Sequence, residues 1–144
     1  MNFIYFDFEY AVKEHDYIIE HSGGLNGGKN LGLLHATIEF VQDDGYYPEI
    51  EDKVCYLFYA INKNHAFNDG NKRSSIALSA YFLEINGLGY IVSKFIDMME
   101  NIAVDVADNI IDRELLKEII AAIIYDEELS YELKLKIINA KTGD

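Results

Sequence analysis

Apolar residues recur every three to four positions along most of this chain, and that spacing limits its fold more than any other feature. Residues 112–124 show it most clearly, with apolar pairs four positions apart: Leu115 and Ile119, Leu116 and Ile120, Ile119 and Ile123, Ile120 and Ile124. Such spacing puts the apolar side chains on one face of an α-helix. Asp112 suits the helix start, because its carboxylate can accept hydrogen bonds from the free backbone N–H groups there.

Six other segments carry a helical pattern: 7–21, 32–42, 51–64, 72–86, 93–109 and 127–140. The segment 72–86 is apolar nearly all round, which is typical of a central helix with neighbours on every side. Strand signals are confined to two short and weak stretches, residues 3–6 and 88–92. We therefore predict an all-α fold, a compact bundle of about six to seven helices. The acidic stretch 126–136 is expected to be a solvated face, with a partner-binding groove as the alternative.

Residues 22–32, SGGLNGGKNLG, interrupt the helical pattern with five glycines. Glycine adopts positive φ without strain and weakens a helix. The segment is predicted to form a loop or short hairpin between the first two helices. A flexible connection without any further role is the alternative.

Composition places further limits on the protein. The chain has 144 residues, a net charge of −13 and one proline, and we expect a single domain over residues 1–144. The acidic surface disfavours binding to a nucleic-acid backbone. No apolar run approaches the roughly 18 residues of a membrane span, and the amino terminus lacks signal-peptide features. We expect a cytoplasmic protein. The single cysteine, Cys55, excludes an internal disulfide and is expected to be inert.

The densest group of polar residues is HAFNDGNKR, residues 65–73, between two predicted helices. Asp69, Gly70 and Asn71 stand at the start of the second helix, where free N–H groups and the positive end of the helix dipole favour an anion. Gly70 permits a turn with positive φ and close approach of a ligand. Lys72 and Arg73 add positive charge, and arginine can grip phosphate oxygens with two hydrogen bonds.

Asp69 and His65 suggest chemistry at this anion site. A carboxylate facing phosphates needs a cation between them, and Mg²⁺ takes one or two carboxylates together with phosphate oxygens. His65, with an ordinary pKa of about 6.5, can take a proton from a hydroxyl as a general base. Phe67 alternates with the polar positions and is expected to turn inward and anchor the loop. Taken singly, Asp69 would be an N-cap and Lys72 a surface charge.

The stretch resembles the signature of the Fic/Doc (Fido) family, His-x-Phe-x-Asp/Glu-Gly/Ala-Asn-x-Arg. The matching residues are His65, Phe67, Asp69, Gly70, Asn71 and Arg73. The glycine-rich segment 22–32 is similar to that of death-on-curing (Doc) proteins. The resemblance covers roughly residues 7–125. It implies an all-α Fido fold and a transferase that moves part of a nucleoside triphosphate, here ATP, onto a Ser, Thr or Tyr hydroxyl of a target protein.

The resemblance also implies a role for each matched residue. The histidine is the general base, the acidic residue holds Mg²⁺, and the arginine binds phosphate. The Gly-Asn backbone and the Asn side chain form the anion hole. A flap before the motif aligns the target chain by strand pairing, and we place it in the glycine-rich segment, at Gly24, Leu25, Asn26, Gly27 and Gly28.

Departures from the pattern bear on which group is transferred. AMP-transferring Fic enzymes carry a second arginine three residues after the first, where this chain has Ile76. Doc toxins also lack that arginine, have Asn-Lys-Arg, and transfer the terminal phosphate; they carry alanine where this chain has Gly70. We therefore favour phosphate transfer from ATP, with AMP transfer (AMPylation) as the alternative. A Fido module that binds without catalysis is the competing class.

Regulation is inferred from a missing motif. Self-inhibited Fic proteins carry Ser/Thr-x-x-x-Glu-Gly/Asn, and no such arrangement occurs in this sequence. A toxin-like chain without its own inhibitory segment implies an antitoxin subunit supplied in trans. The remaining histidines, His15, His21 and His35, have no metal-ligand spacing and are expected to be surface or packing residues.

Overall fold

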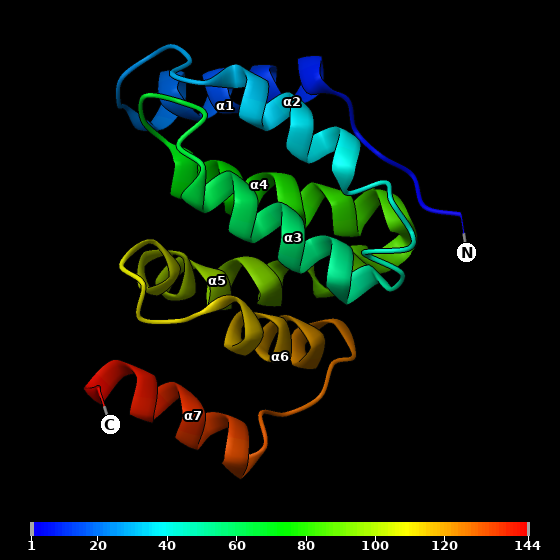
Figure 1. Cartoon of the computed structure of the whole chain (residues 1–144), viewed down its shortest axis with the longest axis vertical. Coiled ribbons are helices and arrows are strands. Elements are labelled where there is room, and N and C mark those ends of the chain that lie inside the picture. Colours follow the sequence, from blue (N-terminus) through cyan, green and yellow to red (C-terminus); the bar gives the residue numbers. More distant parts are fainter. Residues whose placement is uncertain (1, 144) are drawn as a thin grey trace.

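The computed structural model describes residues 2–143, which form seven α-helices (Figure 1). These are α1 (Phe8–Ser22), α2 (Leu31–Phe40), α3 (Ile50–Lys63), α4 (Asn71–Leu83), α5 (Val92–Ala107), α6 (Arg113–Ile124) and α7 (Tyr131–Thr142). A π-turn, η1 (Glu84–Leu88), and a 3-10 turn, η2 (Gly89–Ile91), connect α4 to α5. The described part of the chain contains no strand beyond an isolated bridge between Gly28 and Phe67. The predicted all-α fold is confirmed.

Short polar side chains set where several helices begin. The Asp7 carboxylate accepts a hydrogen bond from the Tyr10 N–H at 2.8 Å, and Asp112 accepts one from the Leu115 N–H at 2.8 Å. Ser130 caps α7 in the same way, so that helix starts four residues later than the pattern predicts. Each contact satisfies one of the N–H groups that a helix start leaves without a partner.

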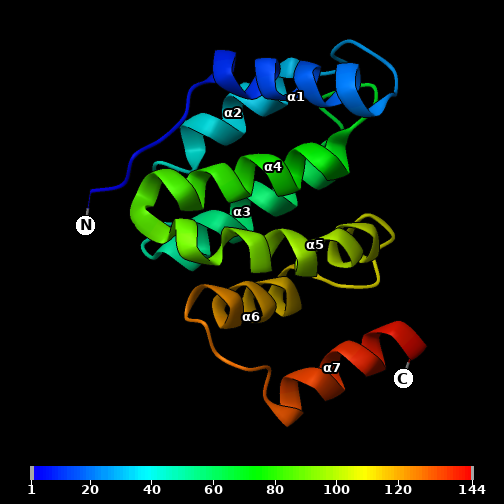
Figure 2. The ribbon, with the colours of Figure 1, turned by 180° about the vertical axis from the view of Figure 1, so that it is seen from behind.

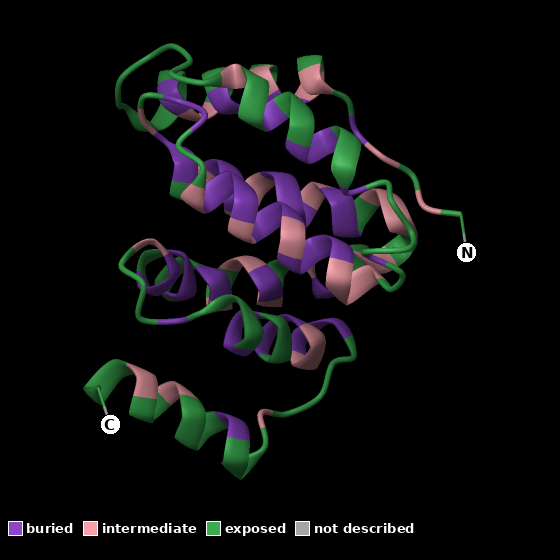
Figure 3. Cartoon of the chain, in the orientation of Figure 1, coloured by how far each residue is buried: buried purple, intermediate pink, exposed green. Residues whose placement is uncertain are grey.

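Helices α3 and α4 form the middle of the molecule, with α1 and α2 on one side and α5 and α6 on the other (Figures 1 and 2). Helix α4 packs against α1, α3 and α5. Buried residues concentrate on these two central helices (Figure 3). The all-round apolar character predicted for residues 72–86 thus reflects neighbours on several sides, as expected for a central helix.

The stretch Asn71–Ala107 is long and apolar enough, by length and composition alone, to cross a membrane. It is not one straight helix, because Gly87 adopts a positive φ of 86° inside η1. The chain turns back there, and α5 packs against α4. Burial within the bundle accounts for the apolar composition of α4.

Helix α7 lies at the edge of the bundle and packs on α6 (Figure 1). Leu133 is its one buried residue within the described part of the chain. Two ion pairs tie it down, Lys136 with Glu118 at 2.9 Å and Lys141 with Asp105 at 3.1 Å. The carboxyl-terminal helix is therefore largely solvated.

Candidate functional site

The HAFNDGNKR loop connects the end of α3 to the start of α4, at one end of the two central helices. Asn64 caps α3, and His65 follows with a positive φ of 50°. Histidine is one of the few residues other than glycine that adopt this conformation with some frequency. The turn leaves the His65 side chain exposed to solvent.

A pocket of about 410 Å³ lies beside this loop. Its walls come from the end of α3, the loop, the first turn of α4 and the end of α5; the lining residues are Asn62, His65, Asn68, Asp69, Gly70, Asn71, Lys72, Arg73 and Ala107. The predicted base, metal ligand and anion-binding residues therefore share one cavity. Phe67 is the one motif residue among those predicted that does not line it.

Phe67 points into the core instead, where 2% of its surface is exposed. Its backbone is held by the side chain of Asn71, which accepts from the Phe67 N–H at 3.2 Å and donates to the Phe67 carbonyl at 3.0 Å. This differs from the resemblance, which gives the asparagine side chain to the anion hole. In this structure both polar atoms of that side chain close the loop.

Asp69 lines the pocket with its side chain 44% exposed. Its Oδ2 accepts from the Leu25 N–H at 3.1 Å and its Oδ1 from the Gly70 N–H at 2.8 Å. These two hydrogen bonds stabilise the carboxylate and lower the pKa of Asp69, with a smaller contribution from the charge of Arg73. The group is therefore an anion at neutral pH.

Positive charge and free N–H groups meet at the start of α4. Gly70 is the N-cap with φ 77°, and the Ser74 N–H makes the first helical hydrogen bond, to the Gly70 carbonyl at 2.9 Å. The backbone N–H groups of Asn71, Lys72 and Arg73 precede that bond and lack helical acceptors. Lys72 is exposed and Arg73 half-exposed. Such a helix start favours an anion.

Lys63, by contrast, does not belong to this positive site. Its ammonium group donates to the carbonyls of Val106 and Ala107 at the end of α5, at 3.3 and 3.4 Å, and to the Asn109 side chain. A cation in that place balances the negative end of the helix dipole. The sequence shows that Lys63 lies two residues before His65, but it does not show that the ammonium group binds the end of α5.

The glycine-rich segment lies along the motif loop. The Gly27 carbonyl accepts from the Asn68 N–H at 3.0 Å, and the Ala66 carbonyl accepts from the Lys29 N–H at 2.8 Å. Arg73 donates to the Gly23 carbonyl at 2.9 Å. The residues predicted for the flap, 24–28, are thus next to the site, and one edge of the segment is already paired with the motif.

Gly24 explains why this segment needs glycine. Its φ is 126°, and an added Cβ would lie 2.7 Å from Asp69 Oδ2 and 3.0 Å from Arg73 Nη2. No other residue fits this backbone and this spacing. The flap therefore approaches the two charged side chains as closely as a bare backbone can.

His15 is the residue at this site that sequence reasoning undervalued. It is fully buried on α1, its ring stacks on Phe67, and its Nε2 lies 2.7 Å from the Asp69 carbonyl oxygen. The prediction of a surface or packing role is right about packing, but it missed the contact with the motif. The available signal was position, since His15 lies four residues from both Ala11 and Ile19 on the apolar face of the helix.

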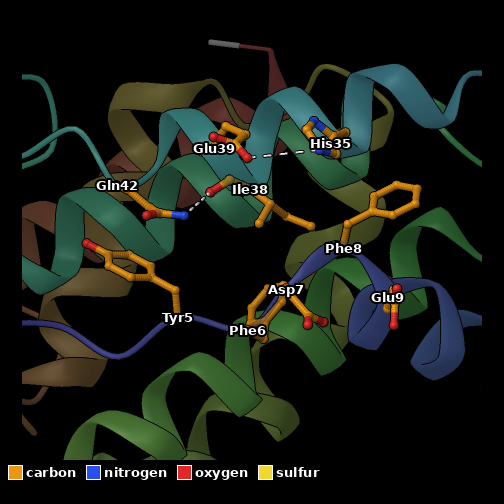
Figure 4. A pocket seen from close by; sticks show the side chains of 9 residues that line it. All are labelled: Tyr5, Phe6, Asp7, Phe8, Glu9, His35, Ile38, Glu39 and Gln42. Atoms are coloured by element: carbon orange, nitrogen blue, oxygen red, sulfur yellow. Dashed lines mark hydrogen bonds and ion pairs between the residues drawn. The ribbon is translucent and has the colours of Figure 1, made fainter.

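A second pocket, of about 510 Å³, opens between the amino-terminal segment and α2 (Figure 4). Tyr5 and Phe8 face Ile38 and His35 across it. No motif residue lines this pocket. No group of three or more His, Cys, Asp or Glu residues able to hold a metal alone occurs within residues 2–143. The motif pocket is the better candidate for chemistry.

Similarity to known proteins agrees with the geometry. The chain is 35% identical over 89 residues to a protein named Toxin Doc of Mycolicibacterium smegmatis, a match covering 59% of this chain and 68% of that relative. It is 37% identical over 84 residues to Protein kinase doc of Escherichia phage P1, covering 56% of this chain and 66% of that relative. The Fic/DOC family model matches residues 5–83, a segment containing the flap, the motif loop and α4. The chain therefore belongs to the Fic/DOC family.

Proposed function

We propose that this protein is a Doc-like toxin that transfers the γ-phosphate of ATP to a hydroxyl side chain of a target protein. The observation that carries the proposal is one pocket lined by His65, Asp69, Lys72 and Arg73 at the start of α4. It unites a possible base, a carboxylate for a metal and a cationic anion site. Support for phosphate transfer also comes from the relative named Protein kinase doc.

In the proposed reaction His65 takes the proton of the target hydroxyl. The hydroxyl oxygen then bonds to the γ-phosphorus, and the bond from that phosphorus to the β,γ-bridging oxygen breaks, which releases ADP. His65 suits this role because its side chain is exposed at the pocket, open to an incoming chain. A positioned general base is worth about 10²–10⁴-fold in rate.

Asp69 is the proposed ligand of Mg²⁺. Its carboxylate is ionised and half-exposed at the start of α4, and it is the one carboxylate lining the pocket. A single carboxylate beside an anion site fits an ion that arrives with the nucleotide, because Mg²⁺ takes most of its ligands from phosphates and water. Bound there, Mg²⁺ would neutralise phosphate charge during transfer.

Phosphate binding is assigned to the start of α4. The backbone N–H groups of residues 71–73 and the side chains of Lys72 and Arg73 supply donors and charge on one side of the pocket. Arg73 lies 3.9 Å from the Asp69 carboxylate and also contacts the flap. Both contacts are partly exposed, so a triphosphate can compete for the guanidinium at modest cost.

Ile76 favours phosphate transfer over AMP transfer. It lies on α4 one turn beyond Arg73, half-buried, and packs against the core. Its side chain offers no hydrogen bond to a phosphate, whereas AMP-transferring relatives in the family place an arginine there. AMP transfer remains the second candidate because Gly70 is the choice of those relatives.

Radioactive label tests the proposal directly. The protein is incubated with Mg²⁺, bacterial lysate and ATP labelled at either the α- or the γ-phosphorus. Label on protein from γ-ATP alone supports phosphate transfer. Label from α-ATP alone supports AMP transfer, because the γ-phosphate then leaves as part of pyrophosphate. No label from either position would contradict both reactions and favour a binding module without catalysis.

We further propose a cytoplasmic protein with an antitoxin partner supplied in trans. The two relatives carry the names of Doc proteins, one of them a toxin, and the chain has no inhibitory motif of the Fic kind. The target chain is proposed to add to the unpaired edge of the flap, residues 24–28, by strand pairing. Growth arrest on expression, relieved by co-expression of a neighbouring small gene product, would support the toxin assignment.

A further inference from the structure

His15 packs against the motif loop and has no place in the proposed chemistry. Its ring is 0% exposed and stacks face to face on Phe67, with centroids 3.6 Å apart. Nε2 lies 2.7 Å from the carbonyl oxygen of Asp69, and Nδ1 lies 3.1 Å from Oδ1 of Asp16. A polar side chain buried to this degree normally makes a hydrogen bond with another polar group. For His15 that partner is the Asp69 carbonyl in the motif loop.

The short distance identifies which ring nitrogen carries a hydrogen. The carbonyl oxygen of Asp69 can only accept, so a bare Nε2 at 2.7 Å would set two lone pairs against each other. Nε2 therefore donates, whether the ring holds one hydrogen or two. The contact with Asp16 is a hydrogen bond only when Nδ1 also carries a hydrogen.

This hydrogen bond sets the direction of the peptide that joins Asp69 to Gly70. All peptides in residues 2–143 are trans, and in a trans peptide the carbonyl and the following N–H point in opposite directions. Because the Asp69 carbonyl points toward α1 and His15, the Gly70 N–H points away from α1. There it donates to Asp69 Oδ1 at 2.8 Å, and both residues line the pocket.

Glycine at position 70 leaves that peptide free to turn over. Gly70 has φ 77°, and glycine populates positive and negative φ almost equally. A turned peptide would present the Asp69 carbonyl oxygen, an acceptor, where the Gly70 N–H now stands. At the start of α4 this would repel an anion. An added Cβ at Gly70 would lie 3.0 Å from Ile19 and 3.4 Å from His15 Nε2, so α1 and the loop are in close contact.

We propose that His15 is a positioning residue that locks the Asp69–Gly70 peptide, so that its N–H stays on the pocket side and holds the Asp69 carboxylate. That the Asp69 carboxylate serves nucleotide binding through Mg²⁺ rests on the proposed function; the lock itself rests on the contacts of His15. His15→Phe keeps a flat ring against Phe67 but removes the donor. His15→Gln places an amide N–H at similar reach and removes the ring. His35→Phe, on the exposed face of α2, is the matched control.

Two measurements on the full-length protein test the lock. The first is the Gly70 amide resonance in ¹H–¹⁵N spectra, and the second is binding of the non-hydrolysable analogue AMP-PNP with Mg²⁺ by calorimetry. We expect His15→Phe to move the Gly70 resonance and weaken AMP-PNP binding about tenfold, the value of one hydrogen bond to a charged group. His15→Gln should restore both, and His35→Phe should change neither.

An unchanged Gly70 resonance in His15→Phe would overturn the lock. If that variant does not fold, ¹⁵N spectra of the His15 ring in the parent protein provide the test. Hydrogen on Nε2 supports the proposal, and hydrogen on Nδ1 alone refutes it. A parent protein that neither binds AMP-PNP nor transfers label would refute the proposed function. The Gly70 resonance and the His15 ring spectra would still test whether His15 holds the Asp69–Gly70 peptide, because neither measurement needs a nucleotide.

Discussion

At the scale of single residues, the site combines groups that are free to react with groups that are tied down. His65 is exposed on a left-handed turn, while the Asn71 side chain is committed to the backbone of Phe67. Asp69 lies between these extremes, since it accepts two backbone hydrogen bonds yet stays half-exposed. The exposed groups are open to an incoming substrate, and the hydrogen bonds of Asn71 and of the loop backbone fix their positions.

His65→Asn is expected to abolish transfer without loss of stability. Asparagine tolerates the positive φ of this position but cannot act as a base at neutral pH, so turnover should fall by about 10²–10⁴-fold. His65→Ala should lose the same activity and also some stability, because alanine disfavours the left-handed turn. Label transfer and thermal unfolding measure the two effects. An active His65→Asn protein would remove His65 from the mechanism.

Asp69→Asn is expected to weaken nucleotide binding in excess Mg²⁺ and to reduce activity further still. The substitution keeps the size and one acceptor oxygen but removes the charge that would hold the ion. Calorimetry with AMP-PNP at several Mg²⁺ concentrations measures the change. A Mg²⁺ dependence equal to that of the parent would show that Asp69 serves only the loop and the helix start.

The same carboxylate gives a pH dependence to the flap. The pKa of Asp69 is lowered chiefly by the Leu25 N–H and then by the Gly70 N–H. For a carboxyl group with a lowered folded pKa, the stabilisation is present above its unfolded pKa of about 3.9 and is lost as pH falls through the folded value. Protection of the Leu25 amide against hydrogen exchange should therefore fall in acid in the parent protein. The Asp69→Asn protein should show no such loss, because its residue 69 does not titrate.

At the scale of elements, the flap and the motif loop form one unit, although Gly28 and His65 are 37 positions apart in the sequence. Backbone hydrogen bonds run between them from Gly27 to Asn30, and Arg73 reaches back to Gly23. The flap is thus held in place by the backbone of the motif loop and by Arg73, which is proposed to bind the nucleotide. Binding of a triphosphate by Arg73 would release one of these contacts.

Gly24→Ala is expected to displace the flap and reduce transfer. The new methyl group would lie 2.7 Å from Asp69 Oδ2 and 2.9 Å from Ile19 Cδ1, so the backbone must shift, and misplacement by about 1 Å can cost roughly 10²-fold. Gly23→Ala is the matched control, because residue 23 also has positive φ but nothing within 4 Å of an added Cβ. Equal label transfer by the two variants would mean that crowding at Gly24 is unimportant.

Ile76→Arg tests how α4 selects the reaction. An arginine at this position shares a helix face with Arg73 one turn earlier, and we expect label transfer to move from the γ-phosphate toward AMP. Some stability should be lost because Ile76 packs against the core. Ile76→Gln, which is polar but uncharged, separates the effect of charge from that of lost packing. Transfer from α-labelled ATP by the parent protein would overturn the kinase assignment.

At the scale of the whole molecule, the bundle is stabilised from its centre. Helices α3 and α4 are buried along most of their length, whereas α7 contributes one buried side chain within the described chain (Figure 3). The motif loop joins the two most buried helices. A loop anchored at both ends in this way is suited to hold reactive groups in fixed positions.

Two substitutions compare the contributions of the centre and the edge of the bundle to stability. Leu57→Ala in α3, at 0% exposure, is expected to cost about 4 kcal/mol of unfolding free energy, near the upper end for such changes. Leu133→Ala in α7, at 8% exposure, is expected to cost about 2 kcal/mol, because the edge of the bundle can relax into the space. Urea unfolding gives both values. Equal losses would contradict a stabilising centre in α3 and α4.

The sequence by itself determined the helices and the order of residues in the motif. Apolar spacing is a local property, so it located all seven α-helices, with errors at ends such as residues 127–130, where the Ser130 cap overrides the pattern. The motif residues lie within nine positions, so proximity along the chain already implied proximity in space. Family resemblance then supplied their roles, which remain proposals.

Only the tertiary structure decided which distant residues share the site. His15 is 54 residues from Asp69 along the chain, and its contact depends on how α1 packs over the loop. The use of Lys63 at the end of α5 and of Asn71 within the loop likewise depends on which acceptors lie in reach after folding. Residue type determines how many hydrogen bonds a side chain can donate or accept. The packing of the helices determines which acceptor or donor it meets, because a buried polar group has no water to bind if a protein partner is missing.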